Sequence, residues 1–451
     1  MGATPVRHTQ LIPAREADAN TARAYAQCLL ESLGATPARP FDLTDEHPAL
    51  TWARSGLMAL TGLPPGSQSG AGFGEPQMCP APIAACADGA LAALASLANP
   101  ETFRELRGSR LLAERAAIAG YSRAGSISPG GSCRLMDASD GVIALNLARD
   151  DDWALLPAWL ECAVPTNWDA VATIIRTLPA QVLVERGRLL GLAVAMNGIP
   201  SPRPWFNARP SYPPRIGVRR DDRKPLVVDL SSLWAGPLCS HLLQACGADV
   251  IKIESTTRPD GARQGPPAFF DLLNAGKRSV VLDFSTQAGR EQLRALLHRA
   301  DIVIEGSRPR ALRQLGIHAE ELIAANPGLT WISLTGYGRA AMVEDWIAYG
   351  DDAAVAAGLS HLQYQATGQW MFVGDAIADP LTGLHAALAA WTSWRSGSGR
   401  LVSLALRDVV RYCIAFDLPA TPKAIRERQR VWTALAMGGN CCHPREGGDP
   451  V

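Results

Sequence analysis

The sequence has no long uninterrupted apolar segment and no excess of one charge. No uncharged apolar run reaches the ~20 residues of a membrane-spanning helix, and the first residues have no apolar core of signal-peptide length. Lys and Arg together number 43, and so do Asp and Glu. This balance gives no electrostatic reason to expect nucleic acid or a membrane as partner. We therefore expect a cytoplasmic protein that binds neither.

The sequence also lacks paired cysteines. Its ten cysteines show no Cys-x-x-Cys spacing, and most lie in apolar runs, as Cys239 and Cys246 do. This pattern predicts reduced, buried thiols. Cys441, Cys442 and His443 are adjacent near the end of the chain, but three adjacent ligands cannot easily close a tetrahedral metal site. We expect no metal, and a disordered tail.

A dinucleotide fingerprint is absent as well. The turn SSLWAGPL, residues 231–238, follows the apolar segment LVVDL but has one glycine instead of the three in Gly-x-Gly-x-x-Gly. A proline stands where a pyrophosphate would need a bare amide. NAD-dependent chemistry is therefore disfavoured.

The chain is long enough for more than one core, and its hydrophobic pattern changes along its length. From residue 226, short apolar strands alternate with helical patterns, which is typical of βαβ units and a parallel sheet covered on both faces. We predict an α/β protein with a Rossmann-like parallel sheet and a smaller α+β domain. The expected parts are a helical segment (1–110), the small α+β domain (111–200), a Pro-rich linker (201–225), the Rossmann-like domain (226–410), and a C-terminal helix and tail (411–451).

Two segments of the chain resemble each other at an offset of 294 residues. Trp52 then coincides with Trp346, Gly56 with Gly350, and Gly89 with Gly383, without a gap. We interpret this as a duplication in which residues 46–100 are a degenerate copy. Where AIADPLTG in the later copy has Asp379, the earlier copy has Ala85.

Asp379 stands directly before a proline at the start of an apolar helix. Asp and Pro are both favoured at helix starts, so this pair by itself can be a simple cap. A helix N-terminus also holds a carboxylate in its ionised form, which a nucleophile requires. The residue types alone make Asp379 only a candidate.

Residues 226 to about 410 resemble the class III CoA-transferases. The matching stretches are VVDLSSLWAGPLCSHLLQACGADVIKIE, GKRSVVLDF, ADIVIEGSRPRALRQLG, ISLTGYG and ADPLTGLHAAL. The resemblance implies an enzyme that moves CoA from an acyl-CoA to a small carboxylic acid, with Asp379 as the covalent nucleophile and no permanently bound cofactor. It implies an aspartyl anhydride followed by an aspartyl-CoA thioester, and a homodimer. The small domain, more weakly similar, precedes the Rossmann-like domain here instead of following it.

The resemblance also implies contacts with CoA. Residues at the corresponding positions are Ser232, Trp234, Ala235, Leu282, Gly306, Ser307 and Tyr349; Arg258, Arg308 and Arg310 are candidate phosphate partners, although each is equally well read as a solvated surface arginine. Ser232, Trp234, Gly306 and Ser307 depart from the residues common in the family. Amides near Gly374 and Gly383 are candidates for oxyanion stabilisation.

Two alternatives stay open. The departures in the CoA contacts suit a catalytically inactive CoA-binding homologue. The related α-methylacyl-CoA racemases place a His-Asp pair where this chain has Tyr349 and Gly350, so that activity is less expected. His385, on an Ala/Leu-rich stripe, is expected to be structural.

Overall fold

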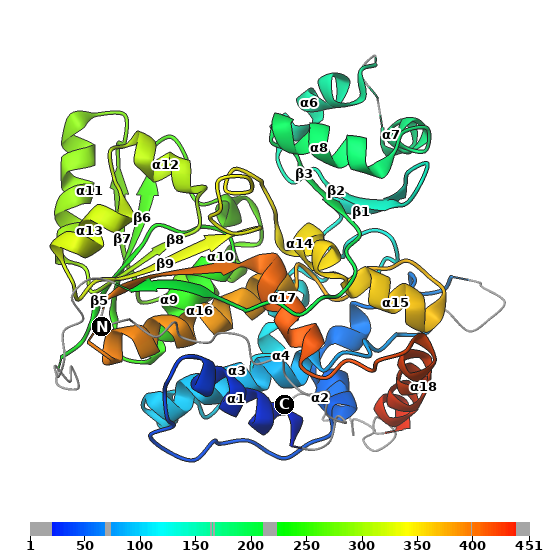
Figure 1. Cartoon of the computed structure of the whole chain (residues 1–451), viewed down its shortest axis with the longest axis horizontal. Coiled ribbons are helices and arrows are strands. Elements are labelled where there is room, and N and C mark those ends of the chain that lie inside the picture. Colours follow the sequence, from blue (N-terminus) through cyan, green and yellow to red (C-terminus); the bar gives the residue numbers. More distant parts are fainter. Residues whose placement is uncertain are drawn as a thin grey trace, which may run out of the picture.

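The protein folds around two separate β-sheets. The structure is a computed structural model that describes residues 20–67, 74–162, 165, 167–210, 223–397 and 399–438. One sheet has seven strands and the other three, and they lie in different lobes of the molecule (Figure 1). The predicted α/β class, with a Rossmann-like sheet and a smaller α+β domain, is confirmed. In the described ranges, no helix combines the length and apolar character needed to span a membrane.

The large sheet has the strand order β4-β10-β9-β8-β5-β6-β7, and only β4 runs antiparallel to its neighbour. Val227 and Val228 point to opposite faces of β5 and belong to different hydrophobic clusters. Runs of Val and Ile form these strands because both faces are covered. The strands are β4 (Asn207–Pro210), β5 (Leu226–Asp229), β6 (Asp249–Ser255), β7 (Arg278–Leu282), β8 (Ile302–Glu305), β9 (Thr330–Thr335) and β10 (Arg400–Ala405).

Helices cover both faces of this sheet (Figure 1). Residues of α9 (Ala235–Ala245) and α16 (Ala378–Arg395) share one hydrophobic cluster with the strands. On the opposite face lie α11 (Gln287–Arg299), α12 (Pro309–Gln314) and α13 (Ala319–Ala325). The remaining helices of the C-terminal half are α10 (Pro267–Asn274), α14 (Gly350–Ala357), α15 (Leu359–Thr367), α17 (Leu406–Ala415) and α18 (Pro422–Gly438).

The Pro-rich segment predicted as a linker contributes to the fold. It contains β4, which pairs with β10 at the edge of the large sheet, the position where proline is tolerated. Trp205 is buried, and its indole Nε1 donates to Ser32 Oγ at 3.0 Å. This part of the segment is therefore packed against the N-terminal helices.

The small domain is an antiparallel sheet, β1-β2-β3, with three helices. Its β1–β2 connection contains Asp140-Gly141, a dipeptide typical of hairpin turns. The elements are β1 (Cys133–Asp137), β2 (Val142–Asn146), β3 (Ala193–Met196), α6 (Asp150–Leu160), α7 (Trp168–Ile175) and α8 (Ala180–Leu190).

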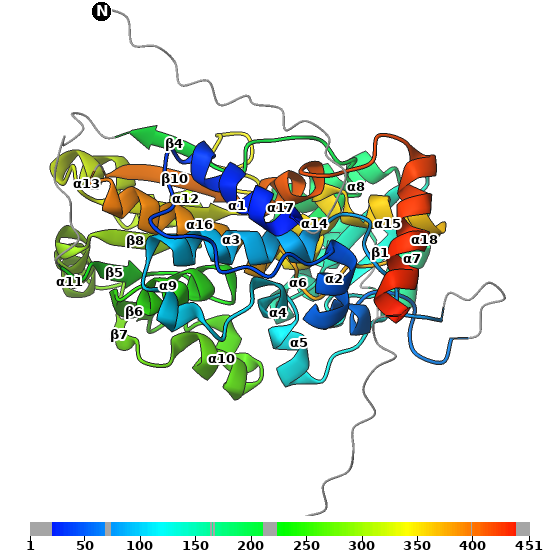
Figure 2. The same ribbon diagram turned by 90° about the horizontal axis from the view of Figure 1, so that it is seen from below.

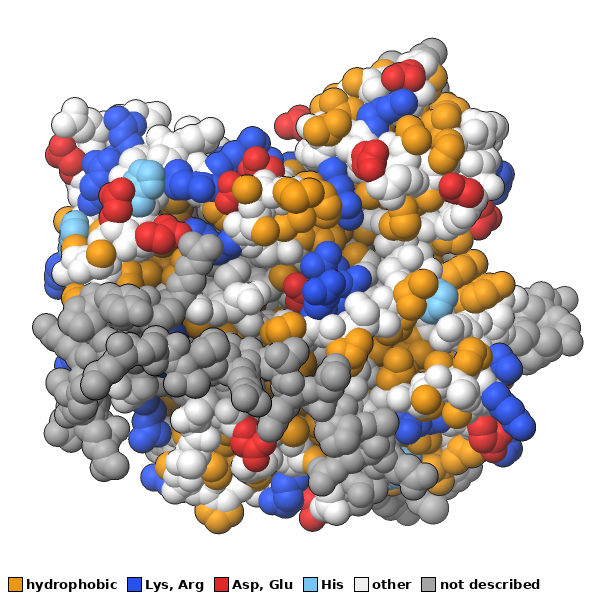
Figure 3. All heavy atoms as spheres, viewed as in Figure 1, with side chains coloured by type: hydrophobic (Ala, Val, Ile, Leu, Met, Phe, Trp, Pro, Cys, Tyr) orange, Lys and Arg blue, Asp and Glu red, His pale blue; other side chains and the backbone are white. Residues whose placement is uncertain are grey.

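Aromatic and polar contacts dock the small domain on the rest of the protein. The guanidinium carbon of Arg188 on α8 lies 3.7 Å from the ring centroid of Trp346 and 5.0 Å from that of Tyr337. Asn146 Nδ2 donates to Asp352 Oδ1 at 3.2 Å. The surface is hollowed between the two lobes, and acidic and basic side chains are interspersed on this face (Figure 3).

The N-terminal helices pack beside α16 and α9. They are α1 (Thr21–Ser32), α2 (Pro48–Ser55), α3 (Ile83–Leu97), α4 (Gly108–Leu111) and α5 (Glu114–Ala119). Helix α3 contacts both α1 and α16, and α16 contacts α9, an arrangement that can be followed in Figure 2.

The helix pairs α1–α3 and α9–α16 are both packed closely at a glycine. A Cβ on Gly89 of α3 would lie 2.5 Å from the Ala22 carbonyl oxygen of α1, and a Cβ on Gly383 of α16 would lie 2.7 Å from the Ala235 carbonyl oxygen of α9. The other matches of the suggested repeat differ in conformation, because Trp52 lies in α2 whereas Trp346 lies outside any helix. The likeness of the two segments therefore resides in their helix pairs.

Candidate active site at the start of α16

Asp379 is the one residue between Met371 and Trp394 that is not buried. It is the second residue of α16, and its N–H donates to the Ala376 carbonyl oxygen at 2.9 Å. Asp379 therefore keeps some exposed surface, although its carboxyl group is strongly desolvated.

The N-terminus of α14 holds the Asp379 carboxylate. The Gly350 amide, at the first position of α14, donates a hydrogen bond to it. A side chain at this position would overlap both the Ala376 carbonyl oxygen and Asp379 Oδ2. The positive end of a helix thus faces the carboxylate at close approach.

The turn before Asp379 has an unusual backbone. Gly374 has φ +71° and Ala376 has φ +42°, and a positive φ is uncommon for alanine. The Ala376 N–H donates to Asp351 Oδ1 at 2.8 Å, and the Gly374 N–H donates to Thr61 Oγ1 at 3.1 Å. These bonds hold the turn in a strained form, which is common at functional sites.

Of the amides near Gly374 and Gly383 that were candidate oxyanion donors, those of the two glycines themselves are already engaged. The Gly374 amide is engaged by Thr61. Gly383 lies inside α16, where its amide belongs to the helical ladder, and it serves the contact with α9. The amide that faces the carboxylate belongs to Gly350 instead.

Arg115 reaches the site from the N-terminal part of the chain. Its Nε and Nη2 donate to Asp375 Oδ2 and Oδ1 at 2.7 and 2.6 Å. Asp375 is fully buried, whereas the Arg115 side chain keeps 29% exposure. Asp375, the other acid near Gly383, is thus occupied by an ion pair. The two residues are 260 positions apart, and no motif in the sequence marks Arg115.

Burial and like charges disfavour ionisation of the site carboxyls. The pKa of Asp379 is raised to about 7, chiefly by desolvation; Arg115 and the Gly350 amide lower it, and Asp351 and Asp375 raise it. Desolvation, followed by the charge of Asp375, raises the pKa of Asp351 to about 7. The site therefore changes its charge near neutral pH.

The turn after β5 combines exposed and buried residues. Ser232 is exposed, whereas Trp234 and Ala235 are buried. Between them, Leu233 has φ +70° and 40% exposure, and its N–H donates to Asp260 Oδ1 at 2.8 Å. Trp234 packs edge-on against Phe269, with ring centroids 5.3 Å apart, so its indole is a core group here.

The other residues expected to contact CoA follow the large-sheet strands. Leu282 is the last residue of β7 and is buried, while Gly306 and Ser307 follow β8, with Gly306 exposed. These positions lie at the carboxyl ends of parallel strands, where α/β proteins bind ligands.

A group of arginines surrounds Arg308. Burial lowers the pKa of Arg308, and so do the charges of Arg310, Arg149 and Arg258. Arg310 pairs with Asp345 at 3.1 Å, and Arg149 pairs with Asp152. Arg258 and Arg308 make no ion pair with the residues that the structure describes. Arg149 belongs to the small domain, and the sequence analysis missed it.

Tyr349 interacts electrostatically with two residues of this basic group and is bonded to a buried carboxylate. It precedes Gly350, and its N–H donates to Asp352 Oδ1 at 2.9 Å. Burial raises the pKa of Tyr349 to about 12, while Arg149 and Arg258 oppose that effect. Tyr349 therefore feels the charges of the basic group and directly precedes Gly350, whose amide acts on Asp379.

His385 is structural, as expected. It is fully buried, and its Nδ1 lies 2.7 Å from the Leu381 carbonyl oxygen while its Nε2 lies 2.7 Å from the Tyr25 hydroxyl. A carbonyl only accepts, so Nδ1 carries a proton and donates it to Leu381. The described ranges contain no group of three potential metal ligands, and the Cys441–His443 cluster lies outside them.

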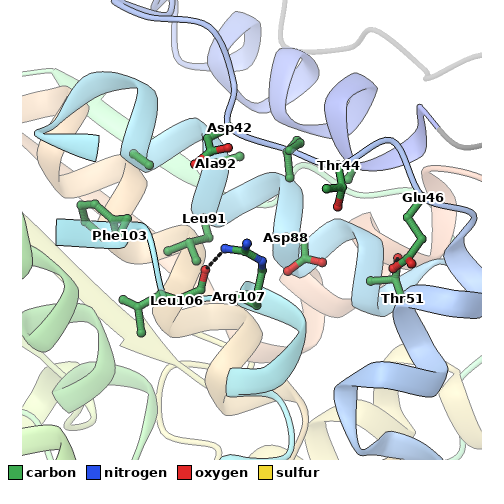
Figure 4. A pocket seen from close by; sticks show the side chains of 14 residues that line it. Asp42, Thr44, Glu46, Thr51, Asp88, Leu91, Ala92, Phe103, Leu106 and Arg107 are labelled. Atoms are coloured by element: carbon green, nitrogen blue, oxygen red, sulfur yellow. Dashed lines mark hydrogen bonds between the residues drawn. The ribbon is translucent and has the colours of Figure 1, made fainter. Parts of the chain in front are cut away.

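A second hollow lies among the N-terminal helices (Figure 4). Its lining includes Asp42, Glu46, Asp88 and Arg107. Asp88 accepts a hydrogen bond from the Ser109 N–H at 2.8 Å. None of the predicted site residues lines this hollow.

Comparison with known proteins agrees with the matched motifs. Residues 225–437 match the model of CoA-transferase family III. A succinate–glutarate CoA-transferase of Agrobacterium fabrum is 33% identical over 214 residues, which cover 44% of this chain and 52% of that protein. A formyl-CoA:oxalate CoA-transferase of Afipia carboxidovorans is 33% identical over 195 residues, covering 41% of this chain and 46% of that protein.

A solved structure also matches in part. The crystal structure of a CAIB/BAIF family protein from Brucella suis shares 34% identity, with 42% of this chain and 53% of that chain covered and a TM-score of 0.39. The chain spans about half the length of the curated relatives it matches.

Proposed function

We propose that the chain, whose residues 225–437 match the model of CoA-transferase family III, transfers CoA from an acyl-CoA to an acceptor carboxylic acid, with Asp379 as nucleophile. The observation that carries this proposal is the state of Asp379: the one partly exposed residue in a buried stretch, hydrogen-bonded to the first amide of α14. The names of two relatives contain succinate, glutarate and oxalate, so small dicarboxylic acids are candidate acceptors.

The first half of the reaction loads CoA on Asp379. A carboxylate oxygen attacks the thioester carbonyl, the carbon–sulfur bond breaks, and a mixed anhydride and CoA thiolate form. The thiolate then attacks the Asp379 carbonyl carbon and displaces the donor as a free carboxylate. The result is an aspartyl-CoA thioester, reached in two modest steps.

The second half repeats these steps with the acceptor. Its carboxylate attacks the aspartyl thioester and releases CoA thiolate, which then attacks the acceptor's carbonyl carbon in the new anhydride. The new acyl-CoA leaves and Asp379 regains its charge. The Gly350 amide and the N-terminus of α14 would stabilise the oxyanion that forms on Asp379 when CoA thiolate or the acceptor attacks its carbonyl carbon, and the carboxylate that is released at the end.

The basic group would bind the phosphates of CoA. Arg258 and Arg308 are the candidates without an ion-pair partner in the described ranges, and a guanidinium matches phosphate geometry. Exposed Ser232 and the strained turn at Leu233 would contact the same substrate. A homodimer remains part of this proposal.

The variant Asp379→Asn tests the proposed nucleophile. Asn keeps the shape of the side chain but is a poor nucleophile, so we expect CoA transfer to fall by roughly three orders of magnitude or more. Wild-type protein incubated with an acyl-CoA and hydroxylamine should yield an aspartyl hydroxamate at residue 379, detected by peptide mass spectrometry.

Asp88→Asn is the matched control. Asp88 lies on α3, the helix of the suggested copy, and its variant should transfer CoA normally. Acyl-CoA binding by the wild type without a trappable adduct would instead identify an inactive CoA-binding homologue. Solvent deuterium entering the α-carbon of the acyl group would identify a racemase.

A further inference from the structure

Arginines from separate parts of the chain gather where the small domain meets α17. Arg188 belongs to α8 of the small domain, and Arg407 and Arg411 belong to α17. Arg203 lies in the segment after β3, and its charge acts on Arg411. Basic side chains lie over α17 in the hollow between the two lobes (Figure 3). These arginines are called the interdomain arginine group below.

Acidic side chains do not balance this group. Asp408 Oδ1 lies 2.8 Å from Arg407 Nε and 3.9 Å from Arg411 Nη1. Arg188 and Arg203 make no ion pair with any residue that the structure describes. Arg407 and Arg411 are four positions apart on one helix face, where like charges repel each other. One contacting carboxylate therefore accompanies four guanidinium groups.

Tyr337 holds the interdomain arginine group together. Its side chain is buried, and the guanidinium carbons of Arg188 and Arg407 lie 5.0 and 5.3 Å from its ring centroid. The guanidinium of Arg188 also lies over Trp346, at 3.7 Å from that centroid. Because an arginine stacked on an aromatic ring keeps a fixed plane, cations from both domains are held around one tyrosine.

Three buried donors in this place lack an acceptor. The Tyr337 hydroxyl, Arg188 Nε and Arg411 Nε have no hydrogen-bond partner in the part of the chain that the structure describes. Buried donors are bonded in nearly all folded proteins, and a guanidinium donates only. Arg411 uses one Nη2 hydrogen bond, at 3.2 Å, for the Ala356 carbonyl oxygen. What the group lacks is an acceptor with negative charge.

We infer that the interdomain arginine group and Tyr337 form a binding site for a phosphate-type oxyanion, which holds the small domain to the rest of the protein. A phosphate group carries about two negative charges. Its oxygens accept from several sides, as donors on α8, on α17 and after β9 require. Inorganic phosphate and a phosphate monoester share this chemistry.

The site is reachable and separate from the basic group around Arg308. The side chains of Arg407 and Arg411 keep 22% and 14% exposure, and Arg203 is exposed. The arginine charges that act most on Arg308 come from Arg310, Arg149 and Arg258, none of which belongs to the interdomain arginine group. The inference therefore does not depend on the proposed CoA transfer.

Thermal unfolding of the wild type tests the site directly. The protein is titrated with inorganic phosphate, and in a second arm with glycerol 3-phosphate, while sodium chloride keeps the ionic strength constant. Because a ligand that binds the native state stabilises it, we expect Tm to rise and to saturate in at least one arm. No rise in either arm, or the same rise when chloride alone is added, would overturn the inference.

The variant Tyr337→Phe separates binding from structure. It removes only a buried hydroxyl that has no partner, so Tm without phosphate should not fall. Its apparent affinity for phosphate should fall several-fold, because the anion loses one donor. A lower Tm together with wild-type phosphate affinity would show that the hydroxyl is structural and would contradict the site.

Arg411→Gln and Arg308→Gln form the matched pair of charge variants. Arg411→Gln should lose most of the phosphate-induced rise in Tm, whereas Arg308→Gln should keep it. Phosphate should also slow proteolysis between the small domain and α17 in the wild type but not in Arg411→Gln. The reverse order of the two variants would place phosphate in the basic group around Arg308, and the inference would be wrong.

Discussion

At the scale of single residues, the geometry of the site depends on Gly350. Its amide binds the nucleophile, and its missing side chain leaves the space that Ala376 and Asp379 occupy. We expect Gly350→Ala to displace the Asp379 carboxylate and to reduce kcat by roughly 100-fold, because a displacement of about 1 Å has that effect on reactive groups. Steady-state kinetics of CoA transfer from an acyl-CoA to a small carboxylic acid measures it.

Gly141→Ala provides the control for a glycine in open surroundings. Its added Cβ would meet no atom closer than the Ala180 Cβ at 3.8 Å. This variant should keep the wild-type kcat. Equal kcat values for both variants and the wild type would show that the close approach at Gly350 has no bearing on the reaction.

The residues of the site could be predicted only in part. Asp379 was indicated because it lies four residues before Gly383 in a matched motif. Arg115 and Arg149 were missed because each meets its neighbours through the tertiary fold, and no local pattern surrounds them. Asp351 was visible beside Tyr349, but its link to the Ala376 amide depends on a positive φ that the sequence does not reveal.

At the scale of elements, α16 and α3 use glycines in the same way. Ala at Gly383 would push α16 away from α9, and Ala at Gly89 would push α3 away from α1. We expect each variant to lose about 1–3 kcal/mol of stability through overpacking, seen as a lower Tm. Gly383→Ala should also lower kcat, since Asp379 belongs to the displaced helix.

Gly89→Ala thus serves as the control, because it introduces the same kind of overpacking in a helix that carries no catalytic acid. A similar loss of Tm but unchanged kcat is its expected result. Loss of kcat in proportion to Tm in both variants would instead show a general effect of stability on activity.

The elements themselves were largely predictable. Strands β5 to β9 were expected from short apolar runs separated by amphipathic segments. Strand β4 was missed because proline and arginine dominate its surroundings, and pairing with β10 at the sheet edge is a tertiary event. The match of Trp52 with Trp346 suggested a structural repeat that these two residues do not follow. They are identical at one offset, but Trp52 lies in a helix and Trp346 does not.

At the scale of the whole molecule, the docking of the small domain rests on Arg188. Its guanidinium lies over the rings of Trp346 and Tyr337, and such contacts are worth about 1–2 kcal/mol when desolvated. Arg188→Ala should loosen the domain, raise the KM for acyl-CoA several-fold and speed proteolysis between the domains. Arg149 would then leave the neighbourhood of Arg308.

Arg186→Ala is the corresponding control on the same helix. Arg186 donates to the Trp159 carbonyl oxygen within the small domain at 3.1 Å. Its loss should weaken that domain without moving it, so the KM for acyl-CoA should stay at the wild-type value. A KM change of the same size in both variants would argue against a docking role for Arg188.

Arg115 comes from the half of the chain that has Ala85 at the position equivalent to Asp379, and it acts on the half that has the acid there. A symmetric assembly of identical subunits carries every substitution in all its sites at once. Here the two helix pairs are encoded separately, so natural selection can alter one and leave the other untouched. The N-terminal helices, α5 with Arg115 among them, can therefore acquire an electrostatic role at the other helix pair, which two identical halves could not do.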